Sequence, residues 1–492
     1  MSPTASAKAP SESSVTRRQS LREIKVVSET PGSLYEAQKK VYPREIAGRF
    51  ARLRIIAAWV LLGLYYLNAW WQWNGRQAFL FDLPARKFYV LGVVFWPQDF
   101  IFLTGLLVLA ALSLFFFTAL AGRLWCGYAC PQTVWTEVFL WMERVTEGDR
   151  AERMKLDAAP WSTSKLVRKS VKQFLWVTFA LWTGFTFVGY FTPIRTLSHE
   201  VLVGTVGGWE LFWIVFYGLA TYGNAGYLRE QVCKYMCPYA RFQSVMFDQD
   251  TLVITYDRER GEQRGARNRS VDYKAKGLGD CVDCGICVQV CPTGIDIRNG
   301  LQYECIGCAA CIDGCNQVMD KMGYPQGLIR YSTEHAMQQR SSAEQVAKRV
   351  FRPRVLVYSA VLWLIILAAA ITLYHRVPLK VNVIRDRGNV MRDADADEAQ
   401  NVYRLQIMNT QEVERDVRIR VSGLDGIELE GPQQPIRVGP ASSRVVPVRV
   451  EAPRTSGAKG SHRIQFTVDA ADPAQPAAQP LEVVEKATFV IP

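Results

Sequence analysis

The chain has 492 residues, 49% of them hydrophobic, and its 58 Lys and Arg outnumber its 46 Asp and Glu for a formal net charge of +12. This length is enough for several domains. We find no nucleic-acid-binding module, so nucleic acid is excluded as a partner, and the basic balance indicates basic loops beside a membrane.

The first 53 residues are expected to form a cytoplasmic tail. Residues 1–16 are rich in Ser, Ala and Pro, as is typical of a disordered segment. No apolar core with a cleavage site follows, so we expect no removable signal peptide. Residues 17–54 carry many Lys and Arg directly before the first apolar run, and this bias predicts a cytoplasmic N-terminus.

Five stretches are long and apolar enough to cross a bilayer as helices, which takes about 20 residues each. They are residues 54–73, 99–121, 172–192, 208–227 and 354–374. The fourth is the weakest, because Gly and polar residues interrupt it near Tyr222-Gly223-Asn224. A shorter apolar segment, 88–96, ends at Pro97, and we interpret it as an interfacial or re-entrant piece.

The charges of the connecting loops predict the orientation of the spans. The loop at 122–171 is rich in basic residues, whereas the loops at 75–98 and 193–207 have few. Because basic loops stay in the cytoplasm, the N-terminus should lie inside and the C-terminus outside.

Two of the expected spans end in the same motif, C-x3-C-P, at Cys126–Pro131 and Cys233–Pro238. This internal repeat divides a membrane domain, residues 54–257, into two helical hairpins. Pro favours the first position of a helix, which would place Cys130 and Cys237 at helix N-termini, where the dipole favours a thiolate. Positive charge nearby strengthens this expectation: Arg123, Lys234 and Arg241.

Three interpretations of these four cysteines stay open. They are small buried residues at helix ends, or a metal site of up to four thiolates, or two dithiol–disulfide pairs. A thiolate site would suit copper(I), zinc or another cluster, with Met236 as a weak additional ligand. The four candidates for catalysis and copper binding are Cys126, Cys130, Cys233 and Cys237.

Residues 258–353 contain the C-x2-C-x2-C-x3-C run twice, which binds 4Fe–4S clusters in bacterial ferredoxins. In two-cluster ferredoxins the fourth Cys of each run binds the other cluster. Soft thiolate ligands in this doubled spacing favour two clusters over a zinc site, and they indicate the reducing cytoplasm for this ferredoxin-like α+β domain. We assign one cluster to Cys281, Cys284, Cys287 and Cys315, and the other to Cys291, Cys305, Cys308 and Cys311.

The last part of the chain changes character. After the fifth span, residues 354–376, the segment 377–492 has no Cys and consists of period-two apolar runs separated by Gly and Pro. This pattern predicts an immunoglobulin-like all-β sandwich of about seven strands. Such domains usually bind partners, but the fold alone does not say which.

Other redox cofactors are not expected. A bis-His haem needs His inside the spans, and the His residues lie elsewhere: His199, His335, His375 and His462. No Gly-rich dinucleotide fingerprint follows a strand, so neither flavin nor NAD is supported.

Together these features resemble the FixG/RdxA/CcoG family, accessory proteins for cbb3-type cytochrome oxidase. The matching stretches are Cys126–Pro131, Cys233–Pro238, Cys291–Arg298, Gly323–Tyr331 and the C-terminal sandwich. The resemblance implies a bacterial inner-membrane protein that reduces copper(II) to copper(I) for assembly of the oxidase. The C-terminal domain of this protein is expected in the periplasm. The resemblance also implies that the C-x3-C-P cysteines are functional.

The partners expected on this basis are a cytoplasmic electron donor, a copper transporter or chaperone, and oxidase assembly factors. The oligomeric state stays open, a dimer included. Two alternative functions also stay open. One is quinol dehydrogenase-like transfer, since membrane ferredoxins of nitrate and nitrous-oxide respiration share paired C-x3-C-P motifs. The other is a non-enzymatic assembly scaffold with structural clusters.

Overall fold

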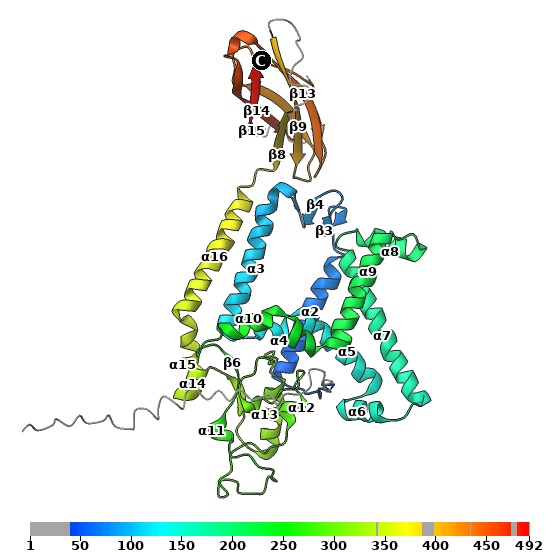
Figure 1. Cartoon of the computed structure of the whole chain (residues 1–492), viewed down its shortest axis with the longest axis vertical. Coiled ribbons are helices and arrows are strands. Elements are labelled where there is room, and N and C mark those ends of the chain that lie inside the picture. Colours follow the sequence, from blue (N-terminus) through cyan, green and yellow to red (C-terminus); the bar gives the residue numbers. More distant parts are fainter. Residues whose placement is uncertain (1–39, 341–342, 386–397, 433, 474–479, 492) are drawn as a thin grey trace, which may run out of the picture. The chain divides into compact units, whose positions relative to one another are not determined.

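The computed structural model describes residues 40–340, 343–385, 398–432, 434–473 and 480–491, and Figure 1 labels its elements. Residues 1–39 of the expected N-terminal tail lie outside the described residues. The first described helix begins at Arg49, five positions before the expected span, and Asp313 caps its start.

Within the described residues, three helices are long and apolar enough to cross a membrane: α2 (Arg49–Asn68), α3 (Phe100–Ala121) together with the turn Pro97–Asp99, and α16 (Pro353–Tyr374). At most 6% of each apolar window is buried inside the protein. Helices with so much outward apolar surface suit lipid rather than water. α3 and α16 lie side by side in Figure 1.

The other two expected spans differ from the prediction. Residues 172–188 fall in α7 (Thr163–Val188), and 189–192 lie beyond its end. The apolar stretch of α7 is diluted by Lys172, Gln173 and several Thr and Trp, and the helix does not qualify by composition. Residues 208–227 form α9 (Gly208–Thr221), and this stretch qualifies only jointly with α8 (Ile194–Val203), at a bend of 98°. The described residues therefore contain three candidate spans, or four if the bent pair counts as one.

The interruption expected near Tyr222 is present. α9 gives way there to the π-helical segment η2 (Tyr222–Leu228), and a second such segment, η3 (Val232–Met236), follows. π-Helical turns are rare in proteins, and those that occur often lie at functional sites. Here they lead directly into the second C-x3-C-P motif.

The segment 88–96 is a pair of strands, and its position at the membrane interface stays a prediction. β3 (Phe79–Asp82), β4 (Lys87–Val90) and β5 (Val93–Phe95) form an antiparallel sheet, preceded by β1 (Gln72–Trp73) and β2 (Arg76–Gln77). Because strand pairing satisfies the backbone, this apolar stretch needs no helix.

Short helices connect the spans. α4 (Leu124–Tyr128) and α5 (Pro131–Glu147) follow α3, then α6 (Arg150–Ala158) leads to α7, and α10 (Pro238–Met246) follows η3. α7 and α9 pack against each other closely, since a Cβ on Gly184 would lie 2.2 Å from the Ile214 carbonyl oxygen. This contact needs Gly at position 184.

The ferredoxin-like domain begins earlier than residue 258. β6 (Val253–Tyr256) pairs antiparallel with β7 (Ile329–Ser332) and closes the domain. Between them lie α11 (Arg258–Gly261), α12 (Ile286–Gln289), η4 (Ile297–Asn299) and α13 (Ala310–Met322). The segments α14 (Glu334–Gln339), α15 (Ala343–Lys348) and η5 (Arg349–Phe351) lead to α16.

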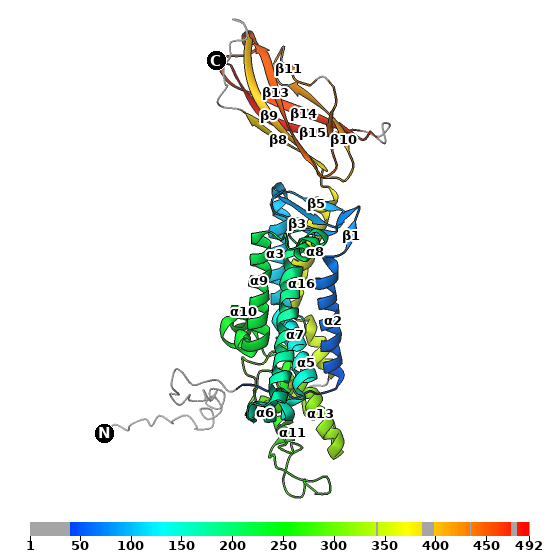
Figure 2. The same cartoon turned by 90° about the vertical axis from the view of Figure 1, so that its right-hand side faces the viewer.

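The C-terminal domain is the expected sandwich, with eight described strands rather than about seven. One sheet has the order β12-β10-β14-β15 and the other β11-β13-β9-β8. Alternate residues such as Tyr403, Leu405 and Ile407 are fully buried between the sheets, as period two requires. Figures 1 and 2 show it from two directions. Its strands are β8 (Leu379–Arg385), β9 (Glu398–Asn409), β10 (Arg415–Ser422), β11 (Glu428–Glu430), β12 (Ile436–Val438), β13 (Ser443–Pro453), β14 (Gly460–Ala471) and β15 (Leu481–Ile491).

Candidate functional site

The eight cysteines of the ferredoxin-like domain line two cavities, each with an empty volume of about 330 Å³. One cavity is lined by Cys281, Cys284, Cys287 and Cys315. The other is lined by Cys291, Cys305, Cys308 and Cys311. Cys287 lines both cavities. The structure thus brings together both sets of four that the spacing suggested, with the fourth Cys of each run facing the other run's cavity.

Left-handed backbone turns shape both loops in the same way. Gly285 follows Cys284 with a φ of 67°, and Ala309 follows Cys308 with a φ of 60°. Each residue sits directly before a helix, α12 or α13, that carries further cysteines into the cavity. Such turns favour residues with little or no side chain, which explains the small residues seen in the motif.

The donor set fits 4Fe–4S clusters. The cavities hold thiols beside apolar side chains such as Ile297, Ile306 and Met319. Burial raises the pKa of Cys308 to about 11 and of Cys315 to about 12, so these thiols stay protonated in the metal-free chain. A buried thiolate needs a positive partner, and iron–sulfur clusters supply one.

The Cys-Pro ends of the two C-x3-C-P motifs have the same local structure. Cys130 immediately precedes Pro131, the first residue of α5, and Cys237 immediately precedes Pro238, the first residue of α10. The prediction that these prolines start helices is confirmed. Cys126 lies within α4, and Cys233 lies within η3.

Both motifs pack against the second cluster loop, residues 303–311. The partly buried side chains of Cys126 and Cys233 contact an apolar cluster that includes Ile306 and Cys308. A Cβ on Gly127 would lie 2.8 Å from the Gly307 carbonyl oxygen, so α4 touches the loop backbone directly. Residues more than 100 positions apart in the sequence therefore meet at one place.

Basic side chains connect the loop to both hairpins. Arg123 donates to the carbonyl oxygens of Cys305, at 3.3 Å, and of Ala240 in α10. Arg54 in α2 donates to the Cys308 carbonyl oxygen at 2.6 Å. These donors fix the loop's position while their positive charge favours electron-rich groups in the cavity.

The thiolate character expected at the helix N-termini does not hold for Cys130 in the metal-free chain, and the thiols of Cys126 and Cys233 are not activated either. Burial raises the pKa of Cys126 to about 12 and of Cys233 to about 11. At Cys130 burial also raises the pKa, although backbone N–H groups of Thr133 and Gln132 act to lower it. The helix N-terminus thus contributes as predicted, but desolvation outweighs it.

All 12 cysteines are free thiols. Within the described part of the chain, no three or more His, Cys, Asp or Glu side chains gather closely enough to hold a single metal ion. Cys126 instead donates a hydrogen bond from Sγ to Gln243 Oε1 at 3.3 Å. Met236 is 59% exposed, so the structure gives no support to its thioether as a ligand.

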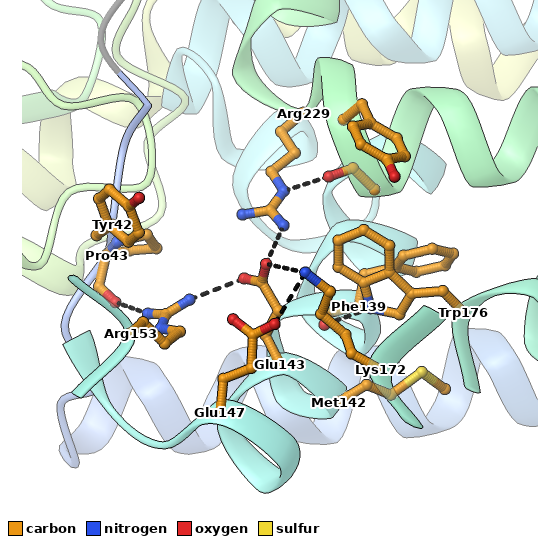
Figure 3. A network of polar contacts seen from close by, with 12 residues as sticks. Tyr42, Pro43, Phe139, Met142, Glu143, Glu147, Arg153, Lys172, Trp176 and Arg229 are labelled. Carbon is orange, nitrogen blue, oxygen red and sulfur yellow. Dashed lines mark hydrogen bonds and ion pairs between the residues drawn. The ribbon is translucent and has the colours of Figure 1, made fainter. Parts of the chain in front are cut away.

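A buried ion-pair network lies at the opposite end of α5, and sequence reasoning missed it. Figure 3 shows Glu143 between Arg153 and Arg229, each at 2.8 Å. Lys172 lies 2.9 Å from Glu147 in the same network. From the sequence, Arg153 is one of the many basic residues of the loop at 122–171. The acidic residues Glu143 and Glu147 nearby in the sequence were the signal that could have indicated an ion pair.

The network joins the two hairpins. Arg229 lies four residues before Cys233, and Gln132, next to Pro131, donates to the Arg229 carbonyl oxygen at 3.1 Å. Arg229 itself has a φ of 41°, a rare value for a residue with a side chain. Its ion pair with Glu143 and its hydrogen bond to the Gly226 carbonyl oxygen hold that conformation.

Comparisons with known proteins agree with these features. Family models described as a 4Fe–4S dicluster domain, a 4Fe–4S binding domain and an immunoglobulin-like fold at the C-terminus of FixG match residues 228–334, 102–146 and 369–492. The second of these covers Cys126 and Cys130. The expected ferredoxin-like and immunoglobulin-like domains are thereby confirmed.

Two curated relatives cover most of the chain. The nitrogen fixation protein FixG of Rhizobium meliloti is 36% identical over 90% of this chain and 91% of its own length. Protein RdxA of Cereibacter sphaeroides is 39% identical over 81% of this chain and 86% of its own. A crystal structure of a FixG-related protein from Vibrio parahaemolyticus is 25% identical and covers 23% of this chain and 95% of that one, with a TM-score of 0.20. This chain belongs to the FixG/RdxA family of iron–sulfur electron-transfer proteins.

Proposed function

We propose that this protein reduces copper(II) to copper(I) at the C-x3-C-P cysteines, in support of assembly of a cbb3-type cytochrome oxidase. The observation that carries the proposal is the convergence of Cys126 and Cys233, from separate hairpins, on the loop that holds Cys305 and Cys308. Thiols placed beside an iron–sulfur site can both bind a soft metal ion and receive an electron for it.

The chemistry of copper fits this arrangement. When bound, 4Fe–4S clusters supply single electrons, and conversion of copper(II) to copper(I) needs one. Thiolates prefer copper(I), so cysteines at this site would stabilise the product over the substrate. Because burial keeps Cys126 and Cys233 protonated, copper binding there would release protons.

The cluster ligands are part of the same proposal. Cys281, Cys284, Cys287 and Cys315 would hold the first cluster, and Cys291, Cys305, Cys308 and Cys311 the second. Both sets line their own cavity, which supports the assignment. The second set lies against the C-x3-C-P motifs, so it is the set from which copper would be reduced.

We further propose a multi-pass protein of the bacterial inner membrane. The apolar helices and the similarity to FixG indicate membrane association. The basic segments around residues 17–54 and 122–171 favour a cytoplasmic N-terminus and cluster domain, with the sandwich in the periplasm. A cytoplasmic donor would supply electrons, and a transporter or chaperone would take copper(I) onward to oxidase assembly factors.

The variant Cys233→Ser/Cys237→Ser tests the proposal. The purified protein with intact clusters is reduced with dithionite under anaerobic conditions, freed of excess reductant and mixed with copper(II), while a colorimetric chelator captures copper(I). We expect at least a tenfold loss of copper(I) formation with unchanged iron content, since two of four soft ligands are gone. Full cupric reduction by the variant would exclude the site.

A quinol is the alternative electron donor to test next. Reduction of the clusters by a quinol, followed by EPR, together with no reoxidation by copper(II), would assign quinone-linked transfer instead. Clusters that cannot be cycled by either partner would indicate a scaffold.

A further inference from the structure

The first cluster loop is the surface-facing end of the electron path. Among the 12 cysteines, Cys284 alone is exposed. The cavity of the second set packs against Cys126 and Cys233 and is thereby covered by the helical hairpins. Electrons from a soluble donor therefore have their shortest access at Cys284.

A basic segment lies directly beside this loop. Residues 258–276 contain seven Arg or Lys against three Asp or Glu. Backbone hydrogen bonds tie the segment to the first cluster loop, from Gly265 N to Cys281 O at 3.3 Å and from Cys281 N to Gly261 O at 3.4 Å. Arg267 donates to the same Cys281 carbonyl oxygen at 3.2 Å.

The acidic residues of this region are already engaged. Glu259 pairs with Arg340 at 2.8 Å, and Glu262 with Arg264 at 3.4 Å. The Asp272 carboxylate accepts from the backbone N–H groups of Lys274 and Ala275.

Asp283, next to Cys284, pairs with Arg298 at 2.5 Å. With seven basic residues against three acidic ones, the segment keeps a positive balance, and exposed side chains carry part of it: Arg258, Arg269, Lys274 and Lys276.

We infer that residues 258–276 and Cys284 form the docking surface for a small, acidic, soluble one-electron carrier protein. This inference rests on the proposed electron-transfer function and names the class of donor. Opposite charge steers such a carrier to the surface and orients it, while the exposed loop allows close approach. The donor loses one electron and the iron–sulfur centre gains one, with no bond made or broken.

The test uses the full-length protein in detergent with intact clusters and an acidic flavodoxin as the probe. The variant Lys274→Glu/Lys276→Glu reverses two exposed charges of the surface. The control variant, Lys155→Glu/Arg168→Glu, makes the same change of charge at exposed positions on α6 and α7. Binding is measured by surface plasmon resonance, and cluster reduction by stopped-flow absorbance with the flavodoxin hydroquinone.

We expect the wild type to bind flavodoxin with an affinity that falls as salt rises, because counterions screen the attraction. The Lys274/Lys276 variant should bind at least tenfold more weakly and be reduced proportionately more slowly, while the control variant matches the wild type. Equal binding by wild type and the Lys274/Lys276 variant, or an equal loss in the control, would overturn the inference.

Dithionite separates this inference from the proposed function. It is small and needs no docking surface, so it should reduce wild type and all variants at equal rates, and copper(I) formation after dithionite reduction should be unchanged. A wild-type protein that does not reduce copper(II) would refute the proposed function. The docking inference would still be decided independently, because it is measured by flavodoxin binding.

Discussion

At the scale of single residues, the site depends on close backbone contact between a C-x3-C-P motif and a cluster loop. Gly127 lies between Cys126 and Cys130, and nothing larger fits there. The spacing of the motif identified the cysteines, but it could not indicate that the residue between them touches Gly307, 180 positions away.

The variant Gly127→Ala tests this contact. The added Cβ would lie 2.8 Å from the Gly307 carbonyl oxygen and 3.0 Å from the Cys308 Cα, so backbone must shift. We expect a destabilisation of about 1–3 kcal/mol and slower cupric reduction, as is common for overpacked sites. Thermal unfolding, iron content and copper(I) capture measure these effects.

Gly105→Ala is the matched control, because a Cβ there meets nothing within 4 Å. Its stability should be unchanged or slightly raised, since Ala favours a helix over Gly. If both variants behaved alike, the close packing of α4 on the cluster loop would be refuted.

At the scale of elements, the buried ion pairs hold the two hairpins in register. Glu143 has a side chain only 1% exposed, and it faces Arg153 and Arg229 from different elements. Removing one partner of a buried pair leaves the other charges uncompensated. The resulting loss of folding free energy is larger than the net stabilisation that the intact pair provides.

We therefore expect Glu143→Gln to lower the free energy of unfolding by about 3–5 kcal/mol. Chemical denaturation of the detergent-solubilised protein, followed by tryptophan fluorescence, measures the change, because Trp176 packs against Lys172 and Arg229. Glu344→Gln removes an exposed pair with Lys348 and should change stability by less than about 0.5 kcal/mol. Equal effects of the two changes would contradict the role of the network.

The same carboxylate predicts a dependence on pH. Burial alone would raise the pKa of Glu143, but Arg229, Arg153 and Lys172 lower it more. A lowered folded-state pKa means that this stabilisation is present above the ordinary carboxyl range, about pH 4, and is lost as the pH falls through the lower value.

Melting temperatures across this acidic range should therefore fall less steeply for Glu143→Gln than for the wild type. Parallel curves for the two proteins would show that Glu143 does not titrate with unfolding.

The features that depend on residues close together in the sequence were predicted well. Tight Cys spacing, the two prolines that start α5 and α10, and the period-two strands of the sandwich depend on neighbouring residues. The β3–β5 sheet and the Glu143 network were missed because they depend on partners far away in the sequence. A short apolar run such as 88–96 fits a strand or a membrane segment equally well until its partners are known.

At the scale of the whole molecule, the chain joins two kinds of structure around one arrangement of thiols. The ferredoxin-like domain supplies two sets of four cysteines, and the helical hairpins supply two pairs beside the second set. The motif spacing assigned the eight ferredoxin-type cysteines to two sets of four, and each set lines a cavity, which agrees with that assignment. It could not show which cavity the C-x3-C-P motifs approach, since only the folded chain sets that contact.

The measurement that tests the central claim most directly is freeze-quench EPR of the dithionite-reduced protein mixed with one equivalent of copper(II). We predict that the copper(II) signal disappears and that the reduced-cluster signal falls by one spin for each copper(II) reduced. Both signals should persist when Cys126, Cys130, Cys233 and Cys237 are all changed to Ser. Persistence of both signals in the wild type, or their loss in the four-Ser variant, would contradict the account.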